Sequence, residues 1–360
     1  MSRIVAARAV FPANVYRQDE ITEVLADAIL GDGPEAAPRR ELMRRLHGAA
    51  EVRTRHLALP LERYHDLGGF QAANDVWIEV GRRLGVEAVS AALAAAGLGP
   101  SDVDLIATTS VTGLAVPSLD ARIAGPLGLR DDVKRMPLFG LGCVAGVAGI
   151  ARIHDYLRGH PDDVAVLLSV ELCSLTFQRD DSSTANLVGS GLFGDGAAAV
   201  VLVGERRATE IGHGRAAQVR ATRSRLYPGS ERVMGWDVGG SGFRLVLAAT
   251  VPDIVDTYLR DDVEAFLAGH GLTVADVDTW IAHPGGPKVI EAILRALDLK
   301  PYALDVTRRS LASVGNLSSS SVLHVLQATL ADRDPGAPSR PAVMLAMGPG
   351  FCSELVLVDL

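Results

Sequence analysis

Cys143 has the surroundings of a reactive cysteine. It stands in the run Gly-Leu-Gly-Cys-Val-Ala-Gly, directly before an apolar segment whose pattern predicts a helix. The unpaired N–H groups and the dipole at a helix N-terminus favour a thiolate over a thiol. Cys143 is therefore a candidate nucleophile, and the alternative is a buried, unreactive cysteine. Cys173 and Cys352 lack this setting, and we expect both to be unreactive.

His283 follows a short apolar run and precedes the turn Pro-Gly-Gly-Pro. The run predicts a buried strand, and ligands of α/β proteins bind at the carboxyl ends of such strands. An imidazole in this position can pair with a thiolate or donate a hydrogen bond to a carbonyl oxygen. The other eight histidines stand in polar or surface-like contexts, and we assign them no role.

Two halves of the chain resemble each other. Residues 97–107 and 271–282 each follow a predicted helix, pass through a short turn and enter a predicted strand. The similarity indicates a divergent duplication, and the alternative is a chance likeness of two βα units. The halves should meet near residue 206, where a charged stretch follows a predicted strand.

The repeat relates Asn316 to Cys143. Cys143 lies 39 residues after Asp104, and Asn316 lies 38 residues after the corresponding Asp278. Each follows a glycine and precedes a predicted helix. Asn316 alone could be no more than a helix cap. With the repeat, we expect both residues to reach one central site.

A thiolate, an imidazole donor and an amide donor together suit acyl transfer followed by carbon–carbon bond formation. Cys143 would take an acyl group as a thioester. His283 and Asn316 would bind the carbonyl oxygen of a second thioester. When that thioester loses carbon dioxide, negative charge moves onto this oxygen, and the two donors stabilise the enolate.

The composition narrows the class of protein. The chain has 360 residues, of which 48% are apolar and 22% charged, so a folded protein with two domains or one duplicated unit is expected. A net charge of −8 disfavours nucleic-acid binding. No apolar run is long enough for a membrane span, and no signal peptide is recognisable. Three cysteines give neither a disulfide framework nor a zinc pattern, so a cytoplasmic enzyme with reduced thiols is expected.

Apolar runs and helical patterns alternate along the chain, which is typical of a layered α/β fold. The predicted strands cover residues 104–108, 164–169, 197–203, 279–282, 342–346 and 354–358. The predicted helices cover residues 73–96, 144–158, 252–270, 288–297 and 319–331.

With these motifs the sequence resembles type III polyketide synthases, the chalcone-synthase-like branch of the thiolase superfamily. The resemblance covers nearly the whole chain. It rests on Gly142-Cys143, on Gly-Leu-Phe-Gly-Asp-Gly-Ala-Ala at 191–198, on His-Pro-Gly-Gly-Pro at 283–287 and on Gly-Asn-Leu-Ser-Ser at 315–319. Initiating ketoacyl synthases share the Cys–His–Asn triad, but the His-Pro-Gly-Gly-Pro run favours the polyketide branch.

The resemblance implies a five-layered αβαβα fold built from two duplicated halves. Residues 1–206 would carry the nucleophilic Cys, and residues 207–360 would carry His and Asn. Members of the family are homodimers, and Val116 would lie in the loop that reaches the partner's cavity. No metal or redox cofactor is implied, because coenzyme A thioesters are the substrates.

The resemblance also implies roles for site residues. Cys143 would hold the starter and the growing chain, while His283 and Asn316 would drive malonyl decarboxylation. Phe193 and Phe243 match the two family phenylalanines between the coenzyme A tunnel and the cavity, although core packing is the ordinary role of a phenylalanine. Positions that align with the cavity lining are Thr109, Ser110, Thr176, Met234 and Ser318. The family's Gly-Phe-Gly-Pro-Gly loop reads Ala-Met-Gly-Pro-Gly at 346–350, which keeps only its last three residues.

Coenzyme A is a polyanion, so an acidic protein that binds it must concentrate positive charge. The densest basic cluster comprises Arg39, Arg40, Arg44, Arg45, Arg53 and Arg55. Arginine binds phosphate oxygens in bidentate fashion. We expect Arg53 and Arg55 at the tunnel mouth, and a solvated helix face for residues 39–45.

Residues 112–120 and 170–178 are similar to bacterial members of the family. Among these, the chain most resembles alkylresorcinol and alkylpyrone synthases, which add malonyl or methylmalonyl units to medium or long fatty acyl-CoA starters. The small residues Gly189, Gly191 and Ala248 would leave room for such a chain. The first alternative is a naphthalene-forming synthase primed by malonyl-CoA; these often have Cys at the position of Thr176. The others are an initiating ketoacyl synthase that works with an acyl carrier protein and a non-catalytic acyl-binding partner.

Overall fold

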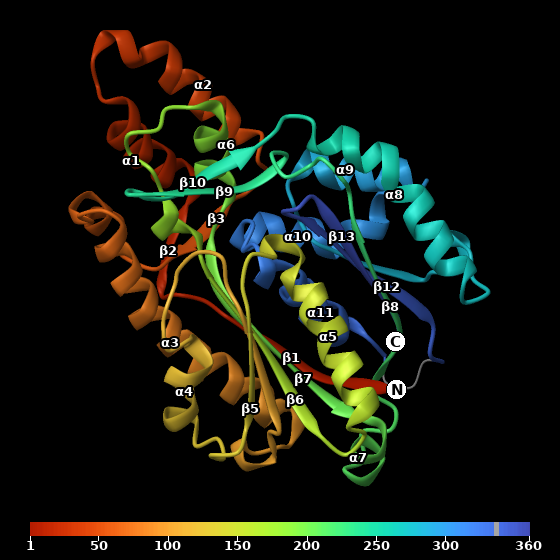
Figure 1. Cartoon of the computed structure of the whole chain (residues 1–360). Helices are drawn as coiled ribbons and strands as arrows, with labels where there is room; N and C mark the ends of the chain where they lie inside the picture. The colour runs from red at the N-terminus through yellow and green to blue at the C-terminus, as the bar shows by residue number, and fades with distance from the viewer. Residues whose placement is uncertain (335–337) are drawn as a thin grey trace.

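Nine strands form one mixed sheet through the centre of the molecule (Figure 1). The computed structural model describes residues 1–334 and 338–360. The strand order is β11-β12-β13-β8-β1-β7-β6-β4-β5. The strands are β1 (Ser2–Val10), β4 (Leu105–Thr109), β5 (Lys134–Leu138), β6 (Val164–Leu172), β7 (Asp195–Gly204), β8 (Ala217–Leu226), β11 (Thr279–Ala282), β12 (Pro341–Gly348) and β13 (Cys352–Asp359).

The sheet contains the same strand arrangement twice, as the sequence repeat predicts. In the first half β4 pairs with β6 in parallel, and β7 and then β1 follow in antiparallel order. In the second half β11 pairs with β12 in parallel, and β13 and then β8 follow in antiparallel order. The turns before β4 and β11 also match. The Asp102 carboxylate accepts the Gly99 N–H at 2.8 Å, and that of Asp276 accepts the Thr273 N–H at 2.8 Å.

The two halves are joined directly to each other. The resemblance implies two duplicated halves, and in the structure residues 2–4 of β1, in the first half, pair with residues 217–219 of β8, in the second. This short antiparallel ladder makes the two sheets continuous. It also satisfies the backbone groups of the inner edge strands, which would otherwise be left unpaired.

Helices complete five layers. One apolar core joins α3 (Phe70–Ala96) and α4 (Leu119–Leu127) to the first half of the sheet. A second joins α8 (Val251–Ala268) and α9 (Pro287–Ala296) to the second half. A third joins α5 (Ala145–Gly159) and α11 (Ser319–Asp332) to strands of both halves. Strands covered on both faces are apolar throughout, which explains the continuous hydrophobic runs that reveal them in the sequence.

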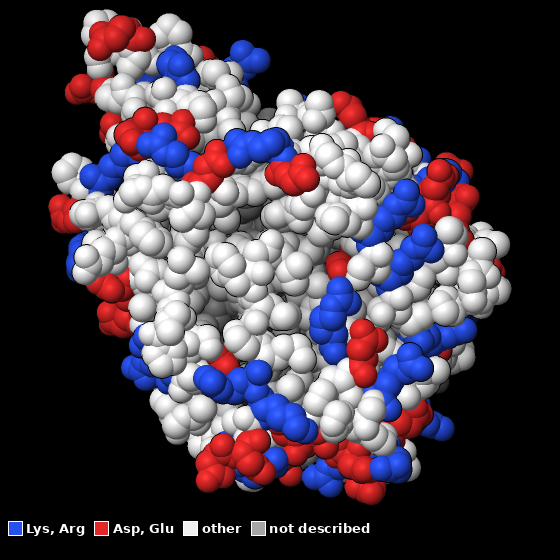
Figure 2. All heavy atoms as spheres, viewed as in Figure 1, with Lys and Arg blue, Asp and Glu red and all other residues white. Residues whose placement is uncertain are grey.

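The remaining elements frame the site. They are β2 (Asn14–Arg17), α1 (Gln18–Leu30), α2 (Ala37–Gly48), β3 (Thr54–Leu57), α6 (Thr184–Leu192), α7 (Glu205–Glu210), the hairpin β9 (Met234–Gly239) with β10 (Gly242–Leu247), and α10 (Asp305–Val314). Figure 2 shows charged side chains around the rim of one face, whose hollowed middle carries few of them. In the part of the chain that the structure describes, no helix has the length and apolar character needed to cross a membrane.

A close contact between α5 and α11 sets the centre of the molecule. A Cβ atom added at Gly146 would lie 2.6 Å from Val322 Cγ1 and even closer to the Ser319 carbonyl oxygen. The helices therefore approach at a distance that only glycine permits. Because Cys143 precedes α5 and Asn316 precedes α11, this contact fixes how far apart the two residues lie.

We expect Gly146→Ala to lower the free energy of unfolding by about 1–3 kcal/mol, since the added methyl group forces α11 away from α5. Urea unfolding followed by circular dichroism measures this change. Gly159→Ala, at the other end of α5, is the matched control because its Cβ would meet no atom within 4 Å. Equal stability of the two variants would contradict the packing argument.

Candidate active site

Cys143 lies in a single 3₁₀ turn, Gly142–Val144, at the start of α5. Its side chain is 8% exposed, and its Sγ lies 3.8 Å from Ser318 Oγ. Gly142 has φ +54°, and a Cβ there would lie 2.6 Å from the Pro349 ring. Glycine is thus required before the cysteine by both conformation and space.

His283 directly follows β11, as predicted. Its N–H donates to the Leu345 carbonyl at 2.8 Å, which extends the pairing of β11 with β12 by one residue. The ring is 5% exposed, and neither ring nitrogen has a hydrogen-bond partner among residues 1–334 and 338–360. A buried polar ring without protein partners is suited to bind a polar group of a substrate.

Asn316 is held by its backbone. Its N–H donates to the Leu192 carbonyl at 2.9 Å, and its carbonyl accepts the Gly194 N–H at 3.0 Å. Its side-chain oxygen Oδ1 accepts the Ser318 N–H at 2.8 Å. Because this bond occupies the amide oxygen, the amide nitrogen is the end that can donate to a ligand.

Cys143, His283 and Asn316 line one cavity of about 430 Å³. The fold thus brings together three residues that are far apart in the sequence. Phe193 and Met234 line the same cavity, as the resemblance implies. Most of the other wall residues are apolar and come from α6, the β9–β10 hairpin, α8 and α9.

The other residues expected in the lining, Thr109, Ser110, Thr176 and Ser318, are not among the wall residues of this cavity. Ser318 contacts Cys143, and Thr176 lines a smaller cavity that shares Phe193 and Leu245 with the first. Thr109 is buried where β4 ends, and Ser110 directly follows the strand.

Phe243 is not in the wall of the Cys143 cavity. Its ring meets that of Phe70 edge-on, with centroids 5.3 Å apart. It lies on β10 two residues before Leu245, which does line the cavity. Strand alternation places both side chains on one face of the hairpin, so Phe243 lies further along that face than the family match implies.

The structure corrects the expectation that Arg55 binds phosphate at a tunnel mouth. Arg55 is 2% exposed, and its Nη1 donates to the carbonyls of Ser190 at 2.7 Å and Phe193 at 2.8 Å. Arg53 is exposed and lines a surface hollow with Arg308 and Arg309. Of the two arginines, only Arg53 is accessible from solvent.

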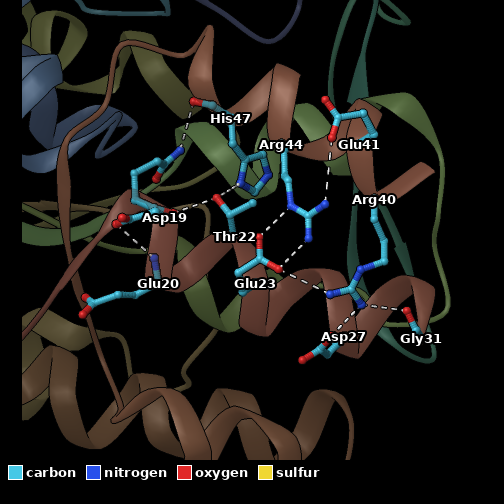
Figure 3. Close-up of polar contacts among 11 residues, drawn as sticks. Asp19, Glu20, Thr22, Glu23, Asp27, Gly31, Arg40, Glu41, Arg44 and His47 are labelled. Atoms are coloured by element: carbon cyan, nitrogen blue, oxygen red, sulfur yellow. Dashed lines mark hydrogen bonds and ion pairs between the residues drawn. The ribbon is translucent and has the colours of Figure 1, made fainter. Parts of the chain in front are cut away.

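Ion pairs with α1 engage two of the four arginines on α2 (Figure 3). Arg40 pairs with Asp27 at 2.5 Å, and Arg44 with Glu23 at 2.8 Å. Arg39, Arg44 and Arg45 are exposed, as expected for a solvated helix face, whereas the Arg40 side chain is only 15% exposed. Arg45 has no ion pair within the described residues.

Sequence reasoning missed two buried polar residues next to the site. His47 is 1% exposed, and its Nδ1 lies 2.8 Å from Thr22 Oγ1 on α1 (Figure 3). Its Nε2 donates to the Leu187 carbonyl on α6 at 3.1 Å. It thus was wrong to regard all remaining histidines as surface-like. The signal was its spacing of four from Met43, which puts both on the buried face of α2.

Glu171 is the second missed residue. It is fully buried in β6 and accepts hydrogen bonds from the Val111 N–H at 3.1 Å, from Thr112 Oγ1 at 2.9 Å and from Ser319 Oγ. It thereby ties the end of β4 to α11. Burial raises its pKa. A single carboxylate within the apolar run 164–172 was the sequence signal.

Burial acts on the two titratable catalytic candidates in opposite directions. It raises the pKa of the Cys143 thiol to about 12 and lowers the pKa of His283 to about 3. Each group, taken alone, is therefore neutral at pH 7. The stabilisation of a thiolate that the sequence predicts from the helix N-terminus is outweighed by the loss of solvation.

Comparisons with known proteins agree with this geometry. The N-terminal domain of chalcone and stilbene synthases matches residues 1–206, and their C-terminal domain matches residues 218–359. A 1,3,6,8-tetrahydroxynaphthalene synthase from Streptomyces peucetius is 55% identical over 359 residues, which is 99% of this chain and 92% of that protein. A putative chalcone synthase from Bacillus subtilis is 34% identical, over 85% of this chain and 86% of that protein.

Solved structures give the same result. The crystal structure of the 1,3,6,8-tetrahydroxynaphthalene synthase from Streptomyces coelicolor, a type III polyketide synthase, has a TM-score of 0.90 at 30% identity, over 99% of each chain. The brown-algal PKS-I from Ectocarpus siliculosus has the same fold, with a TM-score of 0.89 at 24% identity over 99% of this chain and 98% of that one. The chain therefore belongs to the chalcone and stilbene synthase family and is a type III polyketide synthase, an acyltransferase of the condensing type.

Proposed function

We propose that this enzyme uses malonyl-CoA both as starter and as extender and forms a tetrahydroxynaphthalene. The observation that carries this proposal is the 55% identity, over 99% of the chain, to a relative named for that product. A relative from Mycobacterium tuberculosis, named for α-pyrone synthesis, is 27% identical. This replaces the alkylresorcinol or alkylpyrone that the sequence alone favours. Thr176 stands where naphthalene-forming synthases often have Cys, but this is a difference at one position. It weighs less than 55% identity along the whole chain.

The space beyond Phe193 supports a small, polar starter. The smaller cavity, whose wall includes this side chain, holds only about 50 Å³, which is too little for a long alkyl chain. Its wall is mostly apolar, but it includes Arg55, whose Nε and Nη2 have no hydrogen-bond partner within the described residues. Burying these donors against methylene groups is costly, whereas a malonyl-derived chain carries oxygen atoms that can accept hydrogen bonds from them.

The larger cavity suits the pantetheine arm of coenzyme A. It has mostly apolar walls, and it opens to solvent at Lys288, an exposed residue that lines it. A positive charge at this opening favours the phosphates of a coenzyme A thioester. Arg53, exposed on the neighbouring hollow, supplies a second candidate contact.

In the first step we propose that Cys143 Sγ attacks the thioester carbonyl and its proton passes to His283. The new bond joins Sγ to the acyl carbon, the bond from that carbon to the sulfur of coenzyme A breaks, and the departing thiolate takes the proton from His283, which is neutral again. Transfer of the proton creates a thiolate–imidazolium pair, and the attraction between opposite charges is strong in a buried site. The attraction between the two charges thus offsets the desolvation cost that opposes ionisation of either group alone.

In the second step the thioester carbonyl of a malonyl-CoA extender lies between the ring of His283 and the amide of Asn316. Loss of carbon dioxide leaves the electron pair of the broken bond as an enolate, whose oxygen the two donors stabilise. The enolate carbon attacks the thioester on Cys143, and the thiolate leaves. Repetition and ring closure give the product.

We further propose that the enzyme is a homodimer. Val116 is 96% exposed and Phe139 is 58% exposed, which is unusual for apolar side chains of a monomer. Both lie in the segment that leads to Cys143, which is where the family resemblance places the loop that reaches the partner.

With malonyl-CoA as the only substrate, we expect the purified enzyme to form tetrahydroxynaphthalene, detected by mass spectrometry. Cys143→Ala should form none, because no thioester can be held. Cys352→Ala, a matched loss of a thiol outside the cavity lining, should retain the product. Formation of product only when a medium or long acyl-CoA is added, with malonyl-CoA or methylmalonyl-CoA, would contradict the proposal.

We expect His283→Gln to raise the pKa of Cys143 by about 1–3 units, since loss of the imidazolium removes the charge that favours the thiolate. The pKa would then move toward the value of about 12 that burial produces. The rate of Cys143 alkylation by iodoacetamide, measured against pH, reports this shift. His65→Gln is the control, because this side chain is 86% exposed. The same dependence of alkylation rate on pH in the wild type, His283→Gln and His65→Gln would argue against proton transfer to His283.

Val116→Asp should convert the dimer to a monomer in sedimentation experiments, because it places a charge in the buried centre of the interface. Val238→Asp is the matched control, since Val238 is 62% exposed on the β9–β10 hairpin, away from this segment. A monomeric wild-type protein, or a dimeric Val116→Asp variant, would disprove the assignment.

A further inference from the structure

The guanidinium of Arg55 has one edge without a partner. Arg55 extends from β3 into the interior, where Nη1 donates to two backbone carbonyls, those of Ser190 and Phe193. Nε and Nη2 are buried and have no hydrogen-bond partner among the described residues, 1–334 and 338–360. A buried donor without an acceptor costs free energy, so this edge calls for a ligand.

The charge of Arg55 also lacks a contacting anion. Burial lowers the pKa of Arg55 to about 10, so the side chain remains charged at neutral pH. Asp195 attracts this charge from a distance, but its oxygens accept hydrogen bonds from the Ala58 N–H at 2.6 Å and from Ser174. No carboxylate within the described residues lies within 4.0 Å of Arg55. An uncompensated buried charge favours binding of an anion.

The free edge has the shape that binds a carboxylate. Nε–H and Nη2–H point in parallel, and this pair of donors matches the two oxygens of a carboxylate. The protein uses the same edge elsewhere. Nε and Nη2 of Arg44 each donate to an oxygen of Glu23 at 2.8 Å (Figure 3), and those of Arg17 each donate to an oxygen of Asp19 at 3.0 Å. Arg55 presents this edge without such a carboxylate from the chain.

Arg55 lies next to the reaction site. It is a charged side chain in the wall of the cavity of about 50 Å³, whose other wall residues are mostly apolar. Phe193 and Leu245 line both this cavity and the one that contains Cys143. The wall between the two cavities thus includes the side chains of Phe193 and Leu245. Side chains change rotamer much faster than enzymes turn over, so this wall can open during the reaction.

We propose that Arg55 binds the carboxylate of the malonyl starter once this starter is attached to Cys143. The proposal rests on malonyl-CoA as the starter. Binding to Arg55 stabilises the carboxylate of the ground state, whereas decarboxylation moves its negative charge toward the thioester carbonyl. The starter therefore keeps its carboxylate, while an extender, held by His283 and Asn316, loses it. Arg55 would thus distinguish the two roles of one substrate.

The test measures acylation of Cys143 by malonyl-CoA and by acetyl-CoA, which lacks the carboxylate. Rapid quenching and mass spectrometry of the intact full-length protein give the amount of each acyl enzyme and the fraction that retains the carboxyl group. We expect Arg55→Lys and Arg55→Gln to lower the ratio of malonyl to acetyl loading by about tenfold to a hundredfold, the effect of losing charge-assisted hydrogen bonds. Arg17→Lys, which alters the same bidentate edge at the surface, should leave the ratio unchanged.

An equal loss of loading from both substrates would overturn the proposal, because Arg55 would then act only by holding the backbone of Phe193. The Arg55 variants could lower the loading ratio while the wild-type enzyme makes no naphthalene from malonyl-CoA. This result would disprove the proposed product and support this site. The two inferences can therefore fail separately.

Wild-type protein supplies a second measurement, in case the Arg55 variants fold poorly. After Cys143 is blocked with iodoacetamide, free malonate should raise the unfolding temperature, and neutral malonamide should not. A crystal structure with malonate should show a carboxylate on Nε and Nη2; an ordered water there, together with equal effects of malonate and malonamide, would contradict the site. Binding of free malonate at Arg55 with an unchanged loading ratio would show a site for free carboxylates and overturn the role in starter binding.

Discussion

The pairing of two backbone segments, one from each half of the chain, is the interaction on which the site depends. Asn316 exchanges hydrogen bonds with Leu192 and Gly194, on either side of Phe193. The amide of Asn316, which the proposed mechanism uses as a donor, and the side chain of Phe193, which lines both cavities, are thereby fixed to each other. Gly315 permits this approach, since a Cβ there would lie 2.8 Å from the Leu192 carbonyl oxygen. Neither half alone can form the site.

Buried polar side chains hold this pairing in place. Arg55 donates a hydrogen bond to the backbone carbonyl of Phe193, and Glu171 joins the end of β4 to the first turn of α11. His47 connects α2 with α6, whose residues form part of the cavity wall. Such networks are costly if any member is left without partners, so they specify one arrangement of the loops around the cavity. The apolar layers stabilise the fold, and the polar network fixes the positions of the loops around the cavity.

The sequence reveals the layers better than it reveals the site's surroundings. Strands such as β6 and β12 are buried on both faces, and their continuous apolar runs identify them. The edge strand β5 contains Lys134 and Arg135, and the hairpin β9–β10 is half-exposed, so neither has a pattern that distinguishes it from a loop. Cys143 and Asn316 were predictable because each precedes a recognisable helix and the repeat relates them, and His283 because it follows a recognisable strand.

The sequence does not show which side chains long-range packing buries. Arg55 belongs to a basic cluster along the chain, and only its distance from the surface separates it from Arg53, two residues earlier. The same burial explains why the two titratable groups of the proposed mechanism would act together. At their buried positions neither the Cys143 thiol nor the His283 ring gains from ionising alone, yet opposite charges attract strongly there because water screens them little. The low dielectric that opposes each charge singly favours the pair, and it strengthens the hydrogen bonds to an enolate by the same mechanism.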